Sequence, residues 1–140
     1  MKLTKNFNTE EFERSVNATL KGIDNNIPES LMPKAIKIAN MLQVIRDTYG
    51  KPMYISSGYR CPELNKAVGG VSTSQHSKME AADINQHSKD ENKKLYELIV
   101  KLVKDGKIYV GQLINEYDYS WIHISLPRRN KKNNMIFNIK

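Results

Sequence analysis

The feature that most constrains this chain is the stretch from Ile55 to Ile84, which reads ISSGYRCPELNKAVGGVSTSQHSKMEAADI. It places His76 and Asp83 seven residues apart, at the end of a turn-rich segment and the start of an expected strand. A further histidine follows forty residues after Asp83, at His123 in the sequence WIHIS. Two imidazoles and one carboxylate are the ligand set of a zinc site whose fourth position stays open for water. His76, Asp83 and His123 are therefore candidate metal ligands.

Helical signals occur in four places along the chain. Asn8 and Glu11 have the spacing of a capping box, and Phe7 and Phe12 flank them as a hydrophobic staple. This pattern predicts a short first helix that ends near Gly22. Apolar residues at helical spacing, with capping residues and terminal glycines, predict further helices over residues 28–49, 62–68 and 88–104. Ser88 and Glu91 have the spacing of a second capping box, and the paired glycines Gly69 and Gly70 are expected to supply positive-φ positions after the helix over 62–68.

Strand signals are short and fall between these helices. Apolar and β-branched runs predict strands over residues 53–56, 81–84, 111–117 and 121–126, with a further edge strand over 135–139. A tight turn near Asp118 and Tyr119 would join the strands 111–117 and 121–126 as a hairpin. Asp83 stands on an apolar strand, where a carboxylate is expected to be paired or metal-bound because an unpaired buried charge is costly. Helices followed by interleaved strands and helices predict an α+β fold with a small, mostly antiparallel sheet.

Length and composition favour one soluble globular domain over residues 1–140. The 140 residues are 39% hydrophobic and 26% charged, and no apolar run approaches the ~20 residues that span a bilayer. The first residues show no pattern of a signal peptide. Cys61 is the single cysteine, so no intramolecular disulfide is expected. These features predict synthesis in a reducing, cytoplasmic compartment, and nothing in the sequence indicates an obligate oligomer.

The net charge of +7 is concentrated at the C-terminus. The basic segment, residues 128–140, contains no acid and carries five basic side chains, whereas residues 1–127 have a net charge of +2. Such a segment could meet anionic wall polymers, acidic lipids or nucleic acid. A solvated segment that aids solubility explains it equally well, and we expect no nucleic-acid partner and no stable membrane association. The five basic residues are Arg128, Arg129, Lys131, Lys132 and Lys140.

The ordered motifs SGYR, LNKAVGG, SQH, AAD and WIHIS closely resemble the M15 peptidases, the zinc D-Ala-D-Ala carboxypeptidases and L-Ala-D-Glu endopeptidases that cut peptidoglycan stem peptides. The resemblance extends over nearly the whole chain and is closest to a small phage-associated branch. It implies the fold of the hedgehog and D-Ala-D-Ala peptidase group, bound Zn²⁺ and the role of an endolysin that reaches the wall after release or delivery. By this resemblance His76, Asp83 and His123 are the zinc ligands, and Arg60 anchors the substrate.

The sequence departs from the family pattern at the catalytic base. M15 peptidases commonly carry an acidic residue three positions before the last zinc ligand, and that position is Ser120 here. If the hairpin forms, Glu116 lies opposite Trp121, and strand alternation puts Trp121 and His123 on one face. Glu116 is therefore our candidate for the base, with a structural carboxylate as the alternative, and Asp118 in the turn is the weaker candidate.

Other residues near the expected metal site are candidates for substrate binding. Arg60 follows a tight turn, where its guanidinium could bind a substrate carboxylate or act in catalysis by stabilising the oxyanion, with a structural salt bridge as the alternative. Ser74 and Gln75 could orient His76 or bind substrate, or could only cap the loop. Trp121 and Tyr59 could line the cleft, although aromatic packing explains them equally well.

Some residues invite a functional interpretation that we do not favour. His87 is expected to be an exposed loop residue, Cys61 a small packed residue, and 24–26 a plain turn. Met79 occupies a position where M15 peptidases usually carry glycine. The alternative to an enzyme is a non-catalytic module that binds cell wall or serves a phage structure while keeping the zinc-peptidase fold.

Overall fold

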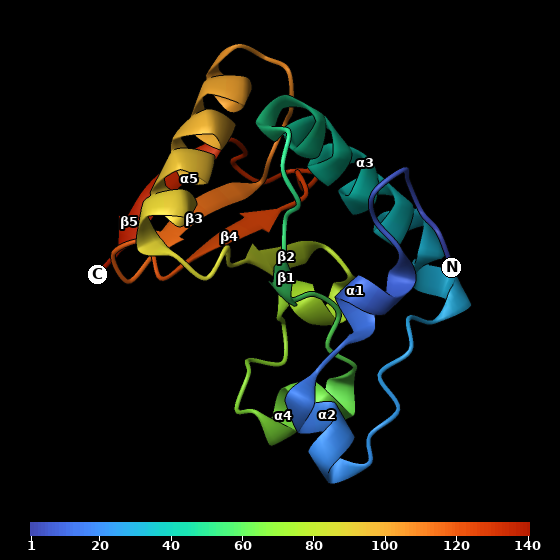
Figure 1. The fold of residues 1–140 in the computed structure, drawn as a ribbon. Helices are drawn as coiled ribbons and strands as arrows, with labels where there is room; N and C mark the ends of the chain where they lie inside the picture. Colours follow the sequence, from blue (N-terminus) through green and yellow to red (C-terminus); the bar gives the residue numbers. More distant parts are fainter.

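The computed structural model describes residues 1–140 and has five strands in one sheet, with helices around it (Figure 1). The sheet order is β1-β2-β4-β3-β5, and every neighbouring pair is antiparallel except β3 and β5. The predicted α+β fold with a mostly antiparallel sheet is confirmed. The helices are α1 (Thr9–Glu13), α2 (Val16–Lys21), η1 (Glu29–Leu31), α3 (Met32–Tyr49), α4 (Pro62–Ala67), η2 (Gln75–Lys78) and α5 (Lys89–Lys104). The strands are β1 (Ile55–Ser57), β2 (Ala81–Ile84), β3 (Gln112–Glu116), β4 (Trp121–Ser125) and β5 (Met135–Ile139).

The hydrophobic core lies between the sheet and the two long helices. Helix α5 crosses β3 and β4, and α3 lies beside α5, whereas α1 lies beside β1, and α2 and α4 lie below β1 in the view of Figure 1. Strand alternation turns Ile122 and Ile124 of β4 into this core, where both are fully buried. His123, between them, must therefore face the side of the sheet turned away from α3 and α5. None of the helices combines the length and apolar character needed to cross a bilayer.

The predicted first helix is interrupted. Arg14 adopts an extended conformation, so α1 ends at Glu13 and α2 begins at Val16. The reason is a second cap, since the Ser15 side chain accepts a hydrogen bond from the backbone of Ala18 at 3.2 Å. The expectation of one helix to Gly22 was wrong, because a serine that could cap a new helix was treated as a helix-interior residue.

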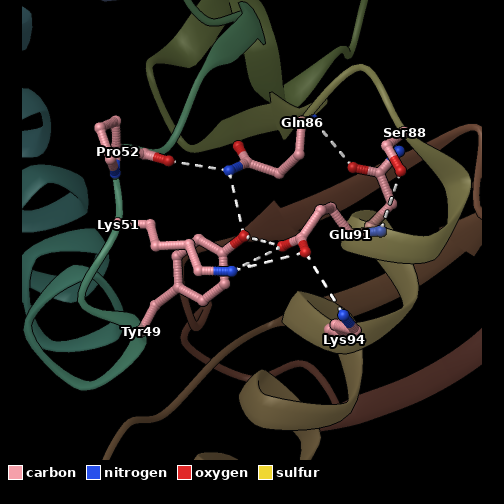
Figure 2. Close-up of polar contacts among 8 residues, drawn as sticks. Tyr49, Lys51, Pro52, Gln86, Ser88, Glu91 and Lys94 are labelled. Carbon is pink, nitrogen blue, oxygen red and sulfur yellow. Dashed lines mark hydrogen bonds and ion pairs between the residues drawn. The ribbon is translucent and has the colours of Figure 1, made fainter.

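A polar cluster joins the C-terminus of α3 to the N-terminus of α5 (Figure 2). Tyr49 donates its hydroxyl hydrogen to Glu91, whose carboxylate also pairs with Lys51 at 3.3 Å and Lys94 at 3.5 Å. Gln86 donates to the carbonyl of Pro52 at 2.8 Å in the same cluster. The predicted cap is present too, because Ser88 accepts from the backbone of Glu91 at 3.2 Å. These contacts hold the β1–β2 side of the sheet against both long helices.

Candidate metal centre and groove

Three elements bring the predicted ligands together on the open face of the sheet. Asp83 of β2 and His123 of β4 are direct neighbours in the antiparallel register. His76 comes from η2, and its side chain lies over the same face, beside the other two. One ligand atom from each residue lies within 4.8 Å of the others. We call His76, Asp83 and His123 the triad.

The protonation of His76 and the spacing of the donor atoms favour a cation between the members of the triad. His76 Nδ1 lies 2.7 Å from the backbone carbonyl of Gly58, and a carbonyl can only accept, so this nitrogen carries the hydrogen. His76 Nε2 therefore presents a lone pair in the neutral ring, and it lies 3.5 Å from Asp83 Oδ1. The same oxygen lies 2.9 Å from His123 Nδ1. Ligand atoms around a tetrahedral Zn²⁺ are separated by about 3.3 Å, so the donor set fits that ion in type and spacing.

Asp83 is ionised throughout the usual pH range. Burial opposes the charge, but hydrogen bonds and attraction from His123 and His76 outweigh it and hold the pKa of Asp83 at about 2. The triad therefore contains one permanent negative charge between two imidazoles.

The SGYR turn is built around a close approach to α1. A Cβ at Gly58 would lie 2.7 Å from the backbone of Phe12, so no larger residue fits there. The next residue, Tyr59, donates from its backbone to the Phe12 carbonyl at 2.7 Å. Because this contact fixes the Gly58 carbonyl, it also fixes the ring orientation of His76.

Beside the triad lies a groove of about 470 Å³, and Glu116 lines it. Glu116 pairs with Trp121 across the hairpin, which confirms the predicted register. Both residues share the face of His123, and Trp121 lines the groove as well. Burial raises the pKa of Glu116; His123 opposes the increase and Asp83 adds to it. A carboxylate on this wall is suitably placed to exchange protons with a group bound at the triad.

Ser120 has a structural role in the hairpin turn. Its hydroxyl donates to the carbonyl of Tyr117 at 2.7 Å, and it does not line the groove. Tyr117, Asp118 and Tyr119 all have positive φ angles, so this turn is tight and uses non-glycine residues in the left-handed region. Nothing at Ser120 replaces the missing acid.

Arg60 lines the groove and forms no ion pair. One guanidinium nitrogen donates to Ser74 Oγ at 3.3 Å, while Nε is buried without a hydrogen-bond partner. Burial lowers the pKa of Arg60, and attraction to Asp83 opposes this. The structure thus lacks the structural salt bridge that was the alternative interpretation, and Arg60 has unused hydrogen-bonding capacity toward a ligand.

Ser74 and Gln75 lie in the loop that carries His76. Ser74 Oγ accepts from the backbone of His76 at 3.2 Å and from Arg60, so it joins two groove residues. Gln75 lines the groove, and its Nε2 is buried without a partner. Of the paired glycines that lead into this loop, only Gly69 has a positive φ angle. Gly70 is needed because a Cβ there would lie 2.1 Å from Asn65 Oδ1, so the expectation that both glycines supply positive φ was wrong.

Sequence reasoning missed Asn25, which it treated as part of a plain turn. Asn25 is buried, and its amide nitrogen donates to the carbonyls of Tyr59 at 2.8 Å and Glu13 at 2.9 Å. Its oxygen accepts from the backbone of Cys61 at 2.8 Å. Asn25 therefore holds both neighbours of Arg60 in the chain. The sequence carries no local signal of this role, because the partners of Asn25 lie 12 to 36 residues away in the chain.

Replacing Asn25 with alanine should destabilise the fold by about 2 to 4 kcal/mol, because buried backbone groups on both sides of Arg60 lose their partners. Chemical denaturation would measure the change. Asn26→Ala is the matched control, since Asn26 is exposed and should change stability by less than about 0.5 kcal/mol. Equal stability of the two variants would contradict this role.

The backbone conformation at Met79 is one that favours glycine. Met79 ends η2 in the left-handed region with φ 55°, and its side chain is fully buried. The backbone conformation suits glycine, whereas the packing requires a large apolar side chain. Met79 therefore contributes to the core at the expense of backbone strain.

Met79→Gly should lower the free energy of unfolding by about 2 kcal/mol, because the lost packing exceeds the strain that is relieved. Met79→Ala should be less stable than Met79→Gly by about 1 kcal/mol, since alanine loses the packing and keeps the strain. Denaturant midpoints of the three proteins would test this order. An alanine variant more stable than the glycine variant would refute it.

The remaining candidates lie outside the triad and groove. His87 is exposed, with its ring 5.7 Å from that of Tyr54. Cys61 caps α4, where its sulfur accepts from the backbone of Leu64 at 3.4 Å. Tyr59 is buried in the core. A second hollow of about 600 Å³ lies near Tyr54 and His87 and contains no member of the triad.

One comparison with known proteins gave a match. A family model described as Peptidase M15 matches residues 5–125. The matched range contains the triad, Arg60 and Glu116. No curated protein matches the chain.

Proposed function

This chain belongs to the peptidase M15 family, and from that premise we propose that it is a zinc-dependent hydrolase of an amide bond in peptidoglycan stem peptides. The observation that carries the proposal is the triad, whose donor atoms lie within 4.8 Å of one another beside a groove. A zinc ion held by the triad would activate water and polarise the scissile carbonyl.

The residues around the triad supply the other functions that amide hydrolysis needs. Glu116 accepts the proton of the attacking water and returns one to the leaving amine. Arg60 binds an anionic group of the substrate through guanidinium nitrogens that no protein carboxylate occupies. Trp121 and Gln75 line the groove and contact the peptide.

Two stem-peptide bonds are candidates for the reaction. One lies between the terminal D-Ala residues, and the other joins L-Ala to D-Glu. We further propose a biological role as a phage or prophage endolysin that reaches the wall after release or delivery from the cytoplasm. The family resemblance of the motifs supports both statements.

The test is metal analysis together with hydrolysis of purified peptidoglycan. After reconstitution with zinc, the protein should hold one zinc ion per chain and release new amino termini from the wall. Bound zinc without cleavage would favour the alternative of a non-catalytic wall-binding or phage structural module, for which Ser120 at the usual base position is the supporting observation. No bound zinc at neutral pH would refute the metal centre.

A further inference from the structure

Arg128 differs from every other residue in its part of the chain. It belongs to the basic segment, and it is the one half-buried residue among positions 127–135, where all others are exposed. It lines the same groove as the triad. It also lies three residues beyond the range that the family model matches, 5–125. One residue of a segment that composition marked only as basic therefore lines the groove.

The loop that carries Arg128 is closed by side-chain to backbone hydrogen bonds. Arg128 donates from its backbone to Asn133 Oδ1 at 2.9 Å, and Asn133 Nδ2 donates back to the Arg128 carbonyl at 3.1 Å. Asn134 then exchanges hydrogen bonds with the backbone of Val110, at 2.6 and 3.0 Å. Because these bonds use only the backbone of Arg128, they hold its position while the guanidinium stays free.

The groove contains two arginines and no acidic partner for either. Arg128 forms no ion pair and its guanidinium makes no hydrogen bond, and Arg60 forms no ion pair. The acids of the groove are Asp83, which the triad's imidazoles hold, and Glu116. A half-buried guanidinium without a counter-ion binds carboxylates well, because its planar donors match that group.

The strand register separates Arg128 from the candidate base. Glu116 and Trp121 form one end of the β3–β4 pair, and His123 pairs with Ile114 in its middle. At the other end Gln112 donates from its backbone to Ser125 Oγ at 2.9 Å. Arg128 follows β4 at that end. The triad thus lies between Glu116 and Arg128 along the strands.

We propose that Arg128 is a second anion-anchoring residue and that the groove selects peptides with two carboxylates, one bound by Arg60 and one by Arg128. This rests on the proposed function and narrows it. Cleavage between L-Ala and a γ-linked D-Glu leaves the α-carboxylate of D-Glu free beside the scissile amide, in addition to the carboxylate at the peptide's C-terminus. A terminal D-Ala-D-Ala pair offers one carboxylate. The inference therefore favours the L-Ala-D-Glu bond.

The experiment compares Arg128→Ala, Arg128→Lys and the matched control Arg129→Ala, which removes an exposed arginine next in sequence. The substrates are the synthetic peptide L-Ala-γ-D-Glu-L-Lys with both carboxylates free and two versions in which one carboxylate is amidated. We expect Arg128→Ala to lower kcat/KM on the dicarboxylate about 10- to 100-fold, mainly through KM. Arg128→Lys should recover part of the lost kcat/KM, and the kcat/KM of Arg129→Ala should stay within about 2-fold of the wild-type value.

The amidated peptides test whether Arg128 binds a substrate carboxylate. Amidation of the carboxylate that Arg128 binds should lower the kcat/KM of the wild type by a similar factor. The same amidation should lower the kcat/KM of Arg128→Ala hardly at all. The inference would be overturned if Arg128→Ala had the same kcat/KM as Arg129→Ala, or if its kcat/KM fell by the same factor on all three peptides. If the wild type cleaves none of them, cleavage of the L-Ala-D-Glu bond is refuted, and the proposed function itself fails only if purified peptidoglycan and D-Ala-D-Ala peptides are not cleaved either. Calorimetric binding of the same peptides to the zinc-reconstituted protein then tests Arg128 separately. Weaker binding to Arg128→Ala than to the wild type would support the role of Arg128. Equal binding to both proteins, or no binding to the wild type, would refute it.

Discussion

Replacing Glu116 with glutamine should lower kcat for stem-peptide hydrolysis by about 100- to 10,000-fold and leave the zinc content at one ion per chain. The amide keeps the shape of the carboxylate but cannot accept the proton of the attacking water. Glu116 is not a member of the triad, so metal binding should not change. Steady-state kinetics and metal analysis of the same preparation measure both effects.

Asp118→Asn is the matched control for Glu116→Gln. Asp118 lies in the hairpin turn with a side chain that is 86% exposed, and it pairs only with Lys89 at 3.8 Å. Its removal should leave kcat within about 2-fold of wild type, as for most exposed positions. The acid limb of the pH profile of kcat/KM should also disappear in Glu116→Gln, because that limb reports the essential base. Full activity in Glu116→Gln would exclude this residue as the base.

Replacing Asp83 with asparagine should weaken zinc binding by about 100-fold or more, since loss of an outer-shell partner alone costs about 10- to 100-fold. Asparagine preserves the size of the side chain. It removes the one permanent negative charge of the triad, because the pKa of Asp83 is about 2. Activity should fall with the metal. Equilibrium dialysis against zinc gives a measurement that does not depend on activity.

His87→Ala is the control for Asp83→Asn. His87 is the one histidine of the chain outside the triad, and it is exposed. Its removal should leave zinc affinity and activity unchanged. Zinc should also raise the thermal midpoint of the wild type and of His87→Ala, because it binds the folded state, and it should have little effect on Asp83→Asn. Stoichiometric, tight zinc in Asp83→Asn would show that the triad is not the metal centre.

The long elements of the fold were predictable because their signals are local. Helix α3 ends at Gly50 with φ 76°, and α5 begins with Ser88 as its N-cap, as the sequence pattern predicts. The hairpin register could also be predicted, because a tight turn between two alternating strands sets which residues face each other. From that register alone Glu116 could be placed opposite Trp121, on the face of His123.

The contacts that support the groove could not be read from the chain. Asn25 stabilises the residues on both sides of Arg60, although 34 positions separate it from Tyr59. Gly58 is required by the backbone of Phe12, which is 46 residues away. Such contacts depend on where two distant segments meet, and neither segment carries a local signal of the other.

The sequence by itself determined the chemistry of this protein, namely the residue types of the triad, their family pattern and the strands that carry two of them. These are properties of short stretches, where spacing and side-chain chemistry are sufficient. Only the tertiary structure decided which charged residues share the groove. Arg128 and Arg129 are identical in type and adjacent in the chain, yet one lines the groove and the other is exposed. Asn133 hydrogen-bonds the backbone of Arg128 in both directions across this loop, and composition and periodicity do not encode such a contact.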